Sequence, residues 1–311
     1  MIEFEVVAEG LRFPEGPVVM GDGSVLVCEI ERGTLSRVRP DTGSTEVVAA
    51  CGGGPNGAAI GPDGAAYITN NGGCFEYIDI GILLPGGVPD TYWGHGAIQR
   101  VDLASGEVTT LCSTSDGRDL RAPNDLVFDA DGGFYFTDHG LRLERSSDRT
   151  GIHYLSADAI ASGGEATEVA FPLDAPNGVG LSPDGSRLYA AETHTGRLWE
   201  WDVVGAGRLE GKGLLDAKGT LVHGAGGYQL FDSLAVDGEG WICVATLANG
   251  GITAVSPDGS RVEHHPVDDP LVTNICFEGA GSDVAYVTAS GTGRLLRCRW
   301  PRRGLDLAYG S

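Results

Sequence analysis

The stretch RAPNDLVFDADGGFYFTDHG, residues 121–140, contains the unit that is repeated along this chain. A polar residue, Asn124, precedes a short hydrophobic run, and a Gly-rich turn leads to a second run that ends about 14 residues later. Five related stretches are RFPEGPVV at Glu15, GGPNGAAI at Asn56, DAPNGVGL at Asn177, QLFDSLAV at Asp232 and LVTNICFE at Asn274. We call these six polar residues the anchors. Their repetition at intervals of roughly 40 to 70 residues predicts a β-propeller rather than a sandwich or an α/β sheet.

Six repeats predict an all-β, six-bladed β-propeller with four-stranded blades, formed by residues 1–311 as a single domain. The 50 glycines support this fold, because many of them stand in Asp-Gly pairs where tight hairpin turns are needed. Residues 3–8 have no anchor of their own, and we expect them to form the outer strand of the last blade and close the ring. Residues 156–161 are the one place where a short helix is expected. The expected blades cover about residues 11–50, 51–116, 117–172, 173–220, 221–269 and 270–311.

Composition excludes several classes of function. The formal charge of −22 argues against nucleic acid as a partner, because phosphate backbones are bound by clustered Lys and Arg. The same charge disfavours a strongly anionic substrate and favours a neutral one. The N-terminal residues resemble no signal peptide and no apolar run approaches membrane length, so we expect a cytoplasmic protein with no membrane partner. The seven scattered cysteines form no CxxC pair and predict neither a zinc knuckle nor a disulfide framework.

Four of the anchors predict a metal site. If the blades converge on one axis, Glu15, Asn124, Asn177 and Asp232 converge with them. Carboxylate and amide oxygens are hard ligands that suit Ca²⁺, and also Mg²⁺ or Mn²⁺. Two carboxylates would balance the charge of one divalent ion, and the two amides would add ligands without adding charge. A single Asn before a strand is usually a turn residue, but four such residues at equivalent places of four repeats favour a metal.

Blade two contains the longest insert, NNGGCFEYIDIGILLPGGVPDTYWGHG, residues 70–96. It mixes aromatic and aliphatic side chains with glycines and prolines. Two interpretations remain open: the insert buries these side chains against its own blade, or it forms a lid or wall over the axial mouth. We favour the second, because long loops on a rigid scaffold commonly determine binding specificity. The loop HGAGGYQLFD, residues 223–232, is a candidate for another part of the same mouth.

These motifs resemble those of the senescence-marker, gluconolactonase and luciferin-regenerating enzyme family, to which diisopropylfluorophosphatase is structurally related. The resemblance covers essentially the whole chain and is carried by FPEGP at Glu15, PND at Asn124, PNG at Asn177 and the segment after Asp232. It implies that Glu15, Asn177 and Asp232 bind a divalent metal at the axis, and that Asn124 completes the coordination or contacts substrate. Two departures, FDS around Asp232 and Arg121 three residues before Asn124 rather than two, weaken the assignment of a particular sugar lactone.

The resulting hypothesis is a metal-dependent hydrolase that opens a small lactone. A bound metal would polarise the carbonyl, water would attack, and the catalytic residue Asp232 would accept the proton of the water or attack directly. Ca²⁺ is the favoured ion, with Mn²⁺, Mg²⁺, Zn²⁺ and Fe²⁺ as alternatives. We expect six polar residues around the substrate: Asn56, Asn71, Arg121, His139, His194 and Asn274. Three aromatic residues are expected to form an apolar wall: Phe75, Tyr77 and Trp93.

Three other functions compete with this hypothesis. The same metal site could support phosphotriester hydrolysis. A propeller can also be a metal-stabilised module that binds small molecules without catalysis, because a fold does not fix a function. A propeller like strictosidine synthase is disfavoured, because that group lacks the full ligand set. The sequence leaves the oligomeric state open.

Overall fold

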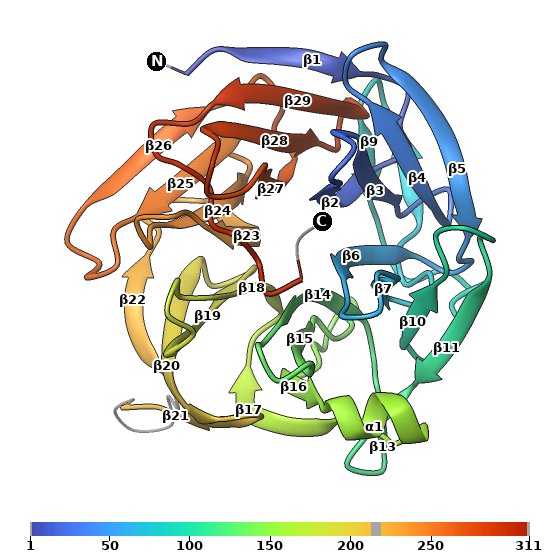
Figure 1. The fold of residues 1–311 in the computed structure, drawn as a ribbon. Helices are drawn as coiled ribbons and strands as arrows, with labels where there is room; N and C mark the ends of the chain where they lie inside the picture. The colour runs from blue at the N-terminus through green and yellow to red at the C-terminus, as the bar shows by residue number, and fades with distance from the viewer. Residues whose placement is uncertain (1, 213–218, 310–311) are drawn as a thin grey trace.

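The computed structural model describes residues 2–212 and 219–309. Six antiparallel sheets surround a central axis, as Figure 1 shows in a view along it. Each sheet is one blade, and the chain runs from the innermost strand outward before it passes to the next blade. This arrangement confirms the six-bladed propeller, and the four-stranded blades are observed in five of the six sheets. The additional strand in blade four arises because its third strand, β20 (Arg197–Gly205), pairs with both β21 (Arg208–Glu210) and β22 (Thr220–Gly224).

The strands of the first three blades, from the axis outward, are as follows. Blade one contains β2 (Pro14–Val19), β3 (Val25–Glu29), β4 (Thr34–Arg39) and β5 (Ser44–Ala50). Blade two contains β6 (Pro55–Ile60), β7 (Ala66–Asn70), β10 (Ala97–Val101) and β11 (Val108–Cys112). Blade three contains β14 (Pro123–Phe128), β15 (Phe134–Asp138), β16 (Thr150–Leu155) and β17 (Thr167–Leu173).

The other three blades complete the ring. Blade four contains β18 (Pro176–Leu181), β19 (Arg187–Glu192), β20 (Arg197–Gly205), β21 (Arg208–Glu210) and β22 (Thr220–Gly224). Blade five contains β23 (Leu230–Val236), β24 (Ile242–Leu247), β25 (Gly251–Val255) and β26 (Val262–Pro266). Blade six contains β27 (Val272–Phe277), β28 (Val284–Ala289), β29 (Arg294–Arg299) and β1 (Phe4–Ala8). Because β22 ends at Gly224, blade four extends past the expected boundary at residue 220.

The hydrophobic core is divided among the contacts between neighbouring blades. Tyr67 of blade two, for example, packs edge-on against Phe128 of blade three with ring centroids 5.1 Å apart. The second strand of a blade is covered on both faces by its neighbours, so strands such as β3, β7 and β15 are buried along their whole length. This explains why the sequence shows continuous hydrophobic runs there instead of a strict alternation.

The N-terminal strand closes the ring as predicted. β1 pairs antiparallel with β29, so that Phe4 lies opposite Cys298. The side chains of Val7 and Ala8 are buried in a cluster that joins blade six to blade one. The last blade is therefore completed by the first strand of the chain, which covers the otherwise free edge of β29.

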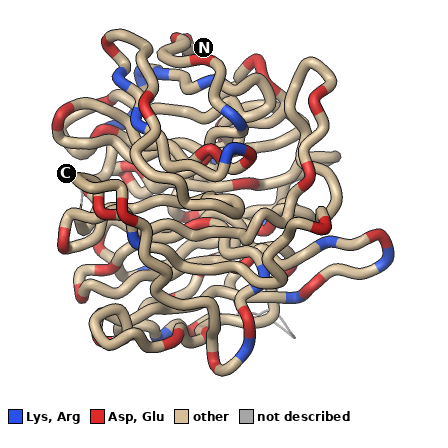
Figure 2. Tube along the Cα trace, turned by 90° about the vertical axis from the view of Figure 1, so that its right-hand side faces the viewer, with Lys and Arg blue, Asp and Glu red and all other residues tan. Residues whose placement is uncertain are grey.

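Little of the described chain lies outside the blades. The helix α1 (Ala157–Ser162) begins where it was expected, because the Ser156 hydroxyl accepts a hydrogen bond from the Ala159 amide at 3.1 Å and caps the helix. Short strand pairs are formed by β8 (Tyr77–Asp79) with β9 (Leu83–Pro85), and by β12 (Thr114–Ser115) with β13 (Arg118–Asp119). In residues 2–212 and 219–309 there is no helix with the length and apolar character needed to cross a membrane. Figure 2 shows acidic and basic residues scattered over many loops.

Candidate functional site

A cavity of about 330 Å³ lies where the innermost strands begin. Five of the six anchors line it, and they come from five different blades: Glu15, Asn56, Asn124, Asn177 and Asp232. The sixth, Asn274, is buried behind the wall, where its Nδ2 donates a hydrogen bond to Glu15 Oε2 at 2.8 Å. A cavity of this volume suits a small organic molecule. The repeat in the sequence thus becomes a ring of polar side chains at one end of the axis.

A register shift at each anchor directs these side chains. In every blade the pairing of the first strand with the second is interrupted next to the anchor, for example between Glu15 and Val18 and between Pro176 and Val179. Such β-bulges redirect side chains and are frequent beside active sites. The strands also approach each other closely here. A Cβ atom on Gly178 would lie 2.4 Å from the backbone nitrogen of Leu234, so that only glycine fits at this position.

A second set of polar residues holds the loops that precede the anchors. Glu29 Oε2 accepts a hydrogen bond from the Arg12 amide at 2.7 Å, and Glu192 Oε1 accepts one from the Asp174 amide at 2.9 Å. Asp138 accepts hydrogen bonds from two consecutive amides of the loop before Asn124. Each of these carboxylates lies at the end of a second strand. The repeated polar residue at that place in the sequence was a signal for this role that the sequence analysis did not use.

The carboxylates of the site are buried without a cationic partner. Burial, and secondly the charge of Asp232, raise the pKa of Glu15 well above its usual range. Burial also raises the pKa of Asp232 to about 7, and the nearby charge of Asp125 contributes. Asp125, which directly follows an anchor and was not predicted, has its own pKa raised to about 7 by burial. Among the described residues none of these three carboxylates forms an ion pair.

The donor set fits a divalent cation. The Oδ1 atoms of Asn56 and Asn124 are buried and have no hydrogen-bond partner within the described chain. Unpaired buried oxygens next to uncompensated carboxylates are costly unless a cation joins them. Asn177 Oδ1 accepts a hydrogen bond from Ser233 at 3.2 Å, which fixes the orientation of this amide. No group of three or more His, Cys, Asp or Glu suited to a metal occurs in residues 2–212 and 219–309, so a cation here would need the Asn oxygens as well as the carboxylates.

Two histidines, His139 and His194, line the cavity together with apolar side chains. The rings of His139 and His194 are 5.7 Å apart, and the ring of Phe75 lies 6.3 Å from that of His139. Burial, followed by the charges of His139 and Arg142, lowers the pKa of His194 to about 4, so its ring is neutral near pH 7. The lining residues that the sequence did not predict come from loops and strand ends of several blades, and include Phe13, Ile30, Leu141, Arg142, Thr193, Leu230, Leu247 and Leu271.

The insert of blade two contributes one wall of the cavity. Its residues Cys74, Phe75 and Val88 line the cavity. Its hairpin of β8 and β9 reaches blade six, where the Leu83 amide donates a hydrogen bond to the Gly291 carbonyl at 2.8 Å. Leu83 also packs in a small cluster with residues of blade one. Part of the insert therefore forms a wall of the cavity, as the second interpretation expects, while Leu83 is buried against blades one and six rather than against the insert's own blade.

The structure brings some of the expected substrate residues to the cavity and leaves others outside. Asn56, Phe75, His139 and His194 line it. The other five expected residues do not line the cavity. Asn71 Oδ1 accepts hydrogen bonds from the Gly73 and Cys74 amides, Tyr77 packs on Phe13, and Trp93 lies against Gly52 and Gly53. Arg121 forms an ion pair with Asp148, and Asn274 donates a hydrogen bond to Glu15.

The fold and the cavity together define a six-bladed propeller with an oxygen-rich site at its axis. Residues 13–291 match the family model of the SMP-30/gluconolactonase/LRE-like region, and the chain belongs to this family. It is 26% identical over 306 residues to gluconolactonase of Zymomonas mobilis, a match that covers 92% of this chain and 78% of the relative. It is 24% identical over 200 residues to diisopropyl-fluorophosphatase of Loligo vulgaris, covering 61% of each chain.

A solved structure supports the fold independently. Regucalcin of Agrobacterium tumefaciens, a calcium-binding protein, superposes with a TM-score of 0.74 and 17% identity, covering 98% of this chain and 97% of that one. At this identity the likeness concerns the fold alone. The propeller architecture is thus shared over practically the full length of both chains.

Proposed function

We propose that this protein is a metal-dependent hydrolase that opens the ring of a small lactone. The observation that carries the proposal is the ring of anchors, in which buried carboxylates and unpaired amide oxygens face one cavity. Family membership and the similarity to a gluconolactonase support the same reaction class. The cavity, with its apolar upper wall, has the size and lining expected for a small organic substrate.

The residues that would hold the cation are Glu15, Asn124, Asn177 and Asp232. Their oxygen atoms suit Ca²⁺ best, and Mn²⁺, Mg²⁺, Zn²⁺ and Fe²⁺ are the alternatives. The likeness to a calcium-binding propeller is in line with this choice. Asn274 would hold Glu15 in place through its hydrogen bond to Oε2, and the Gly16 amide donates a second hydrogen bond to the same oxygen at 2.7 Å. When bound, a divalent ion supplies a positive charge that polarises a carbonyl and stabilises the developing oxyanion.

Asp232 is the residue proposed to move the proton. Its carboxylate lies in the cavity, where one oxygen would hold the cation and the other could accept a proton. It would accept a proton from the attacking water and later return it to the leaving alkoxide. In the alternative pathway the same carboxylate attacks the carbonyl carbon and forms an acyl-enzyme that water hydrolyses. The neutral rings of His139 and His194 would orient polar groups of the substrate, and Phe75 would pack against its apolar face.

A panel of substrates and metals tests this proposal. Neutral and charged lactones and a fluorophosphate would be assayed with protein treated with EDTA and reloaded with Ca²⁺, Mn²⁺, Mg²⁺ or Zn²⁺. We expect lactone opening that EDTA abolishes, loss of turnover in Asp232→Ala, and loss of bound metal in Glu15→Gln, with the exposed Asp41→Asn variant as a matched control.

Other results would favour another function. Hydrolysis of the fluorophosphate alone would favour the phosphotriesterase function suggested by the similarity to diisopropyl-fluorophosphatase. Binding of small molecules without turnover of any substrate would favour a non-catalytic binding propeller. Full activity of Asp232→Ala would show that the assigned chemistry is wrong.

A further inference from the structure

Arg142 is a cation on the cavity wall with no ion-pair partner among the described residues. Its side chain is exposed and lines the cavity, so it lies at the mouth, above the buried anchors. Several other arginines are paired with nearby carboxylates, such as Arg12 with Glu31 at 2.8 Å and Arg187 with Glu200 at 3.0 Å. Arg145 and Arg149 of the same loop also form no ion pair within the described residues, but of these three arginines only Arg142 lines the cavity. Within the described residues the guanidinium of Arg142 takes part in no ion pair and no hydrogen bond. In a chain with 43 acidic residues, a cation left unpaired at a cavity is available to a ligand.

We propose that Arg142 selects a substrate that carries an anionic group, so that the favoured lactone bears a carboxylate or a phosphate in addition to its ring ester. This inference rests on the proposed lactone hydrolysis and names the substrate class. A guanidinium forms two parallel hydrogen bonds with a carboxylate or a phosphate, and this geometry makes Arg the usual recognition residue for such groups.

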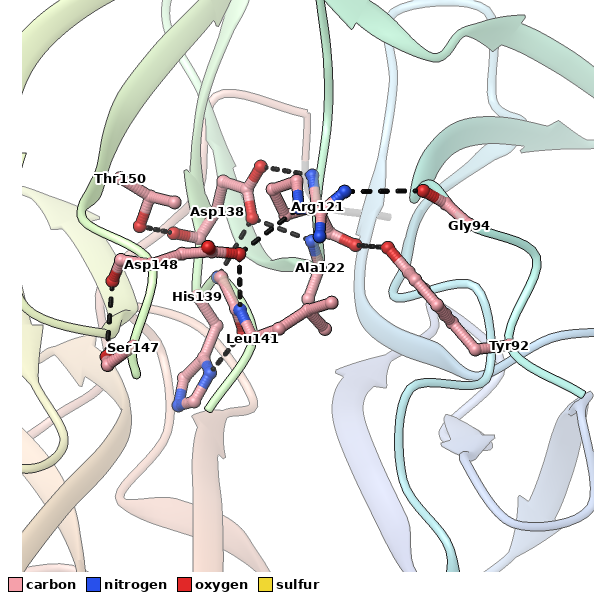
Figure 3. A network of polar contacts seen from close by, with 11 residues as sticks. Tyr92, Gly94, Arg121, Ala122, Asp138, His139, Leu141, Ser147, Asp148 and Thr150 are labelled. Atoms are coloured by element: carbon pink, nitrogen blue, oxygen red, sulfur yellow. Dashed lines mark hydrogen bonds and ion pairs between the residues drawn. The ribbon is translucent and has the colours of Figure 1, made fainter. Parts of the chain in front are cut away.

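The backbone that carries Arg142 is held in place by a network of polar contacts. Asp148 Oδ2 accepts hydrogen bonds from Arg121 Nε and from the Leu141 amide, both at 3.1 Å, and the Asp148 amide donates one to the Leu141 carbonyl at 2.9 Å. The Tyr92 hydroxyl donates a hydrogen bond to the Arg121 carbonyl at 2.6 Å. Figure 3 shows this network around Asp148. A binding residue on a fixed hairpin loses less conformational freedom when its ligand arrives.

This network gives Arg121 a different role from the one expected. Arg121 lies outside the cavity, and its charge is paired with Asp148. It acts as a positioning residue, because Asp148 binds both the guanidinium of Arg121 and the backbone amide of Leu141, the residue before Arg142. The cation that faces the cavity is therefore Arg142, 21 residues further along the chain.

A second polar group near Arg142 is also without a partner. His194 lines the same cavity, and its Nε2 atom is buried with no hydrogen-bond partner in the described chain. Burial is the main cause of its lowered pKa, and the charges of His139 and Arg142, which line the same cavity, contribute. A neutral histidine can donate one hydrogen bond to an anion without adding charge. The mouth thus offers a fixed cation and an unpaired ring nitrogen, while the buried anchors below offer carboxylates.

The two regions would orient an anionic lactone. Arg142 at the mouth attracts an anion, whereas the carboxylates of Glu15 and Asp232 would be balanced by the divalent ion and would leave no positive excess at the anchors. A substrate with one anionic end would therefore bind with that end at the mouth and its ring ester toward the anchors. A neutral lactone lacks this orientation signal and would bind in several ways, which lowers the productive fraction.

The test compares matched lactones on wild type and three variants. The substrates are a neutral aldonolactone, a monolactone of an aldaric acid and a phosphorylated aldonolactone. The variants are Arg142→Gln, Arg142→Lys and the control Arg145→Gln, which changes an exposed arginine of the same loop that does not line the cavity. A hydrogen-bonded charge contributes about 1.5 to 3 kcal/mol, so Arg142→Gln should lower kcat/KM for the preferred anionic lactone by about 10- to 100-fold, mainly through KM.

The pattern across substrates decides the result. We expect wild type to prefer one anionic lactone, Arg142→Gln to lose this preference because its kcat/KM falls much further with the anionic lactone than with the neutral one, and Arg145→Gln to behave as wild type. Retention of part of the preference by Arg142→Lys is expected, since Lys keeps the charge without the paired geometry. Preference for the carboxylate or for the phosphate substrate identifies the anion. Equal losses on neutral and anionic lactones, or no preference in wild type, would overturn the inference.

Calorimetric binding separates this inference from the proposed function. The probe is the open-chain aldarate or phosphoaldonate, which needs no turnover. If no lactone is opened but these anions bind wild type and Arg145→Gln more tightly than Arg142→Gln, the hydrolase proposal fails and the anion site stands. If lactones are opened and neither rate nor anion binding depends on Arg142, the hydrolase stands and the anion site is refuted.

Discussion

Replacing Asp232 by Asn should make the metal-free protein more stable at pH 8, although it removes the proposed catalytic base. Burial raises the pKa of this carboxyl from 3.8 to about 7. Above pH 7 the folded metal-free protein must carry an ionised, buried carboxylate, and the difference between the two pKa values corresponds to roughly 4 kcal/mol. Asn has a similar shape and no charge. With an unfolding entropy of about 2.1 cal/mol/K for each of 311 residues, the expected increase in Tm is about 6 °C.

The pH dependence has a definite sign. Because the folded pKa is higher than the unfolded one, the protonated carboxyl favours the folded state fully below about pH 4, and this contribution is lost as the pH rises through about 7. Glu15, whose pKa is raised in the same direction, adds to the loss. Metal-free wild type should therefore become less stable from pH 4 to pH 8. Asp232→Asn should make the stability depend less on pH. Divalent metal should stabilise wild type at pH 8 by about 2.7 kcal/mol at a concentration of 100 times Kd.

Thermal unfolding of protein treated with EDTA, followed by circular dichroism between pH 5 and pH 8, measures these effects. Asp41→Asn is the matched control, since it removes one exposed carboxylate and should leave Tm nearly unchanged. Addition of Ca²⁺ to each sample then shows whether stabilisation by metal is lost in Asp232→Asn. A metal-free Asp232→Asn variant that is no more stable than wild type at pH 8 would refute the assignment of a destabilising buried charge.

Three further predictions concern other parts of the molecule. Phe75→Ala should change the ratio of kcat/KM between small and bulky lactones by about 10-fold or more, whereas Trp93→Ala should leave it unchanged, because only Phe75 lines the cavity; the reverse result would place the wall elsewhere. Deletion of residues 2–8 should lower Tm and cause aggregation in light scattering, because β29 loses its outer partner and becomes an exposed edge that pairs only with β28; a stable monomer would contradict this. Asp237→Ala should cost about 3–5 kcal/mol in denaturant unfolding without changing KM, because it removes one of the two carboxylate partners of buried Arg302 and the acceptor of the Glu239 and Trp241 amides; a cost below about 1 kcal/mol would be inconsistent.

The fold could be predicted because its information is local and repeated. Each anchor lies near the start of the first strand of a blade, and the same unit recurs in six blades, so the number of blades follows from the count of repeats. The closure by β1 followed from a strand-like segment that lacked an anchor. The meeting of the anchors in one cavity follows from the symmetry of the ring, although the β-bulges that direct them could not be foreseen from the hydrophobic pattern.

The upper part of the site could not be predicted in the same way, because it depends on contacts between loops that are not repeated. Tyr77 and Trp93 belong to an aromatic insert, but composition does not reveal which side chains the hairpin turns inward. Arg121 precedes an anchor and was therefore an obvious candidate, yet Asp148, on a later loop, pairs with its guanidinium. Arg142 lies 18 residues after Asn124 and has no motif of its own. Its role became visible only from its place in the cavity.

The local arrangement at Arg142 also explains why the net charge does not determine the charge of the substrate. The acidic excess is spread over loops around the molecule (Figure 2), where exposed charges farther than about 8 to 10 Å from a ligand are largely screened at physiological salt. A guanidinium at the mouth acts at contact distance and is screened much less. The diffuse field reduces the rate at which an anion approaches, whereas the contact with Arg142 slows its departure. A substrate anion can therefore be preferred at equilibrium by a protein with a charge of −22. Raising the salt concentration should first increase the association rate of the anion, because salt screens the diffuse repulsion, and should weaken the contact with Arg142 only at higher concentrations.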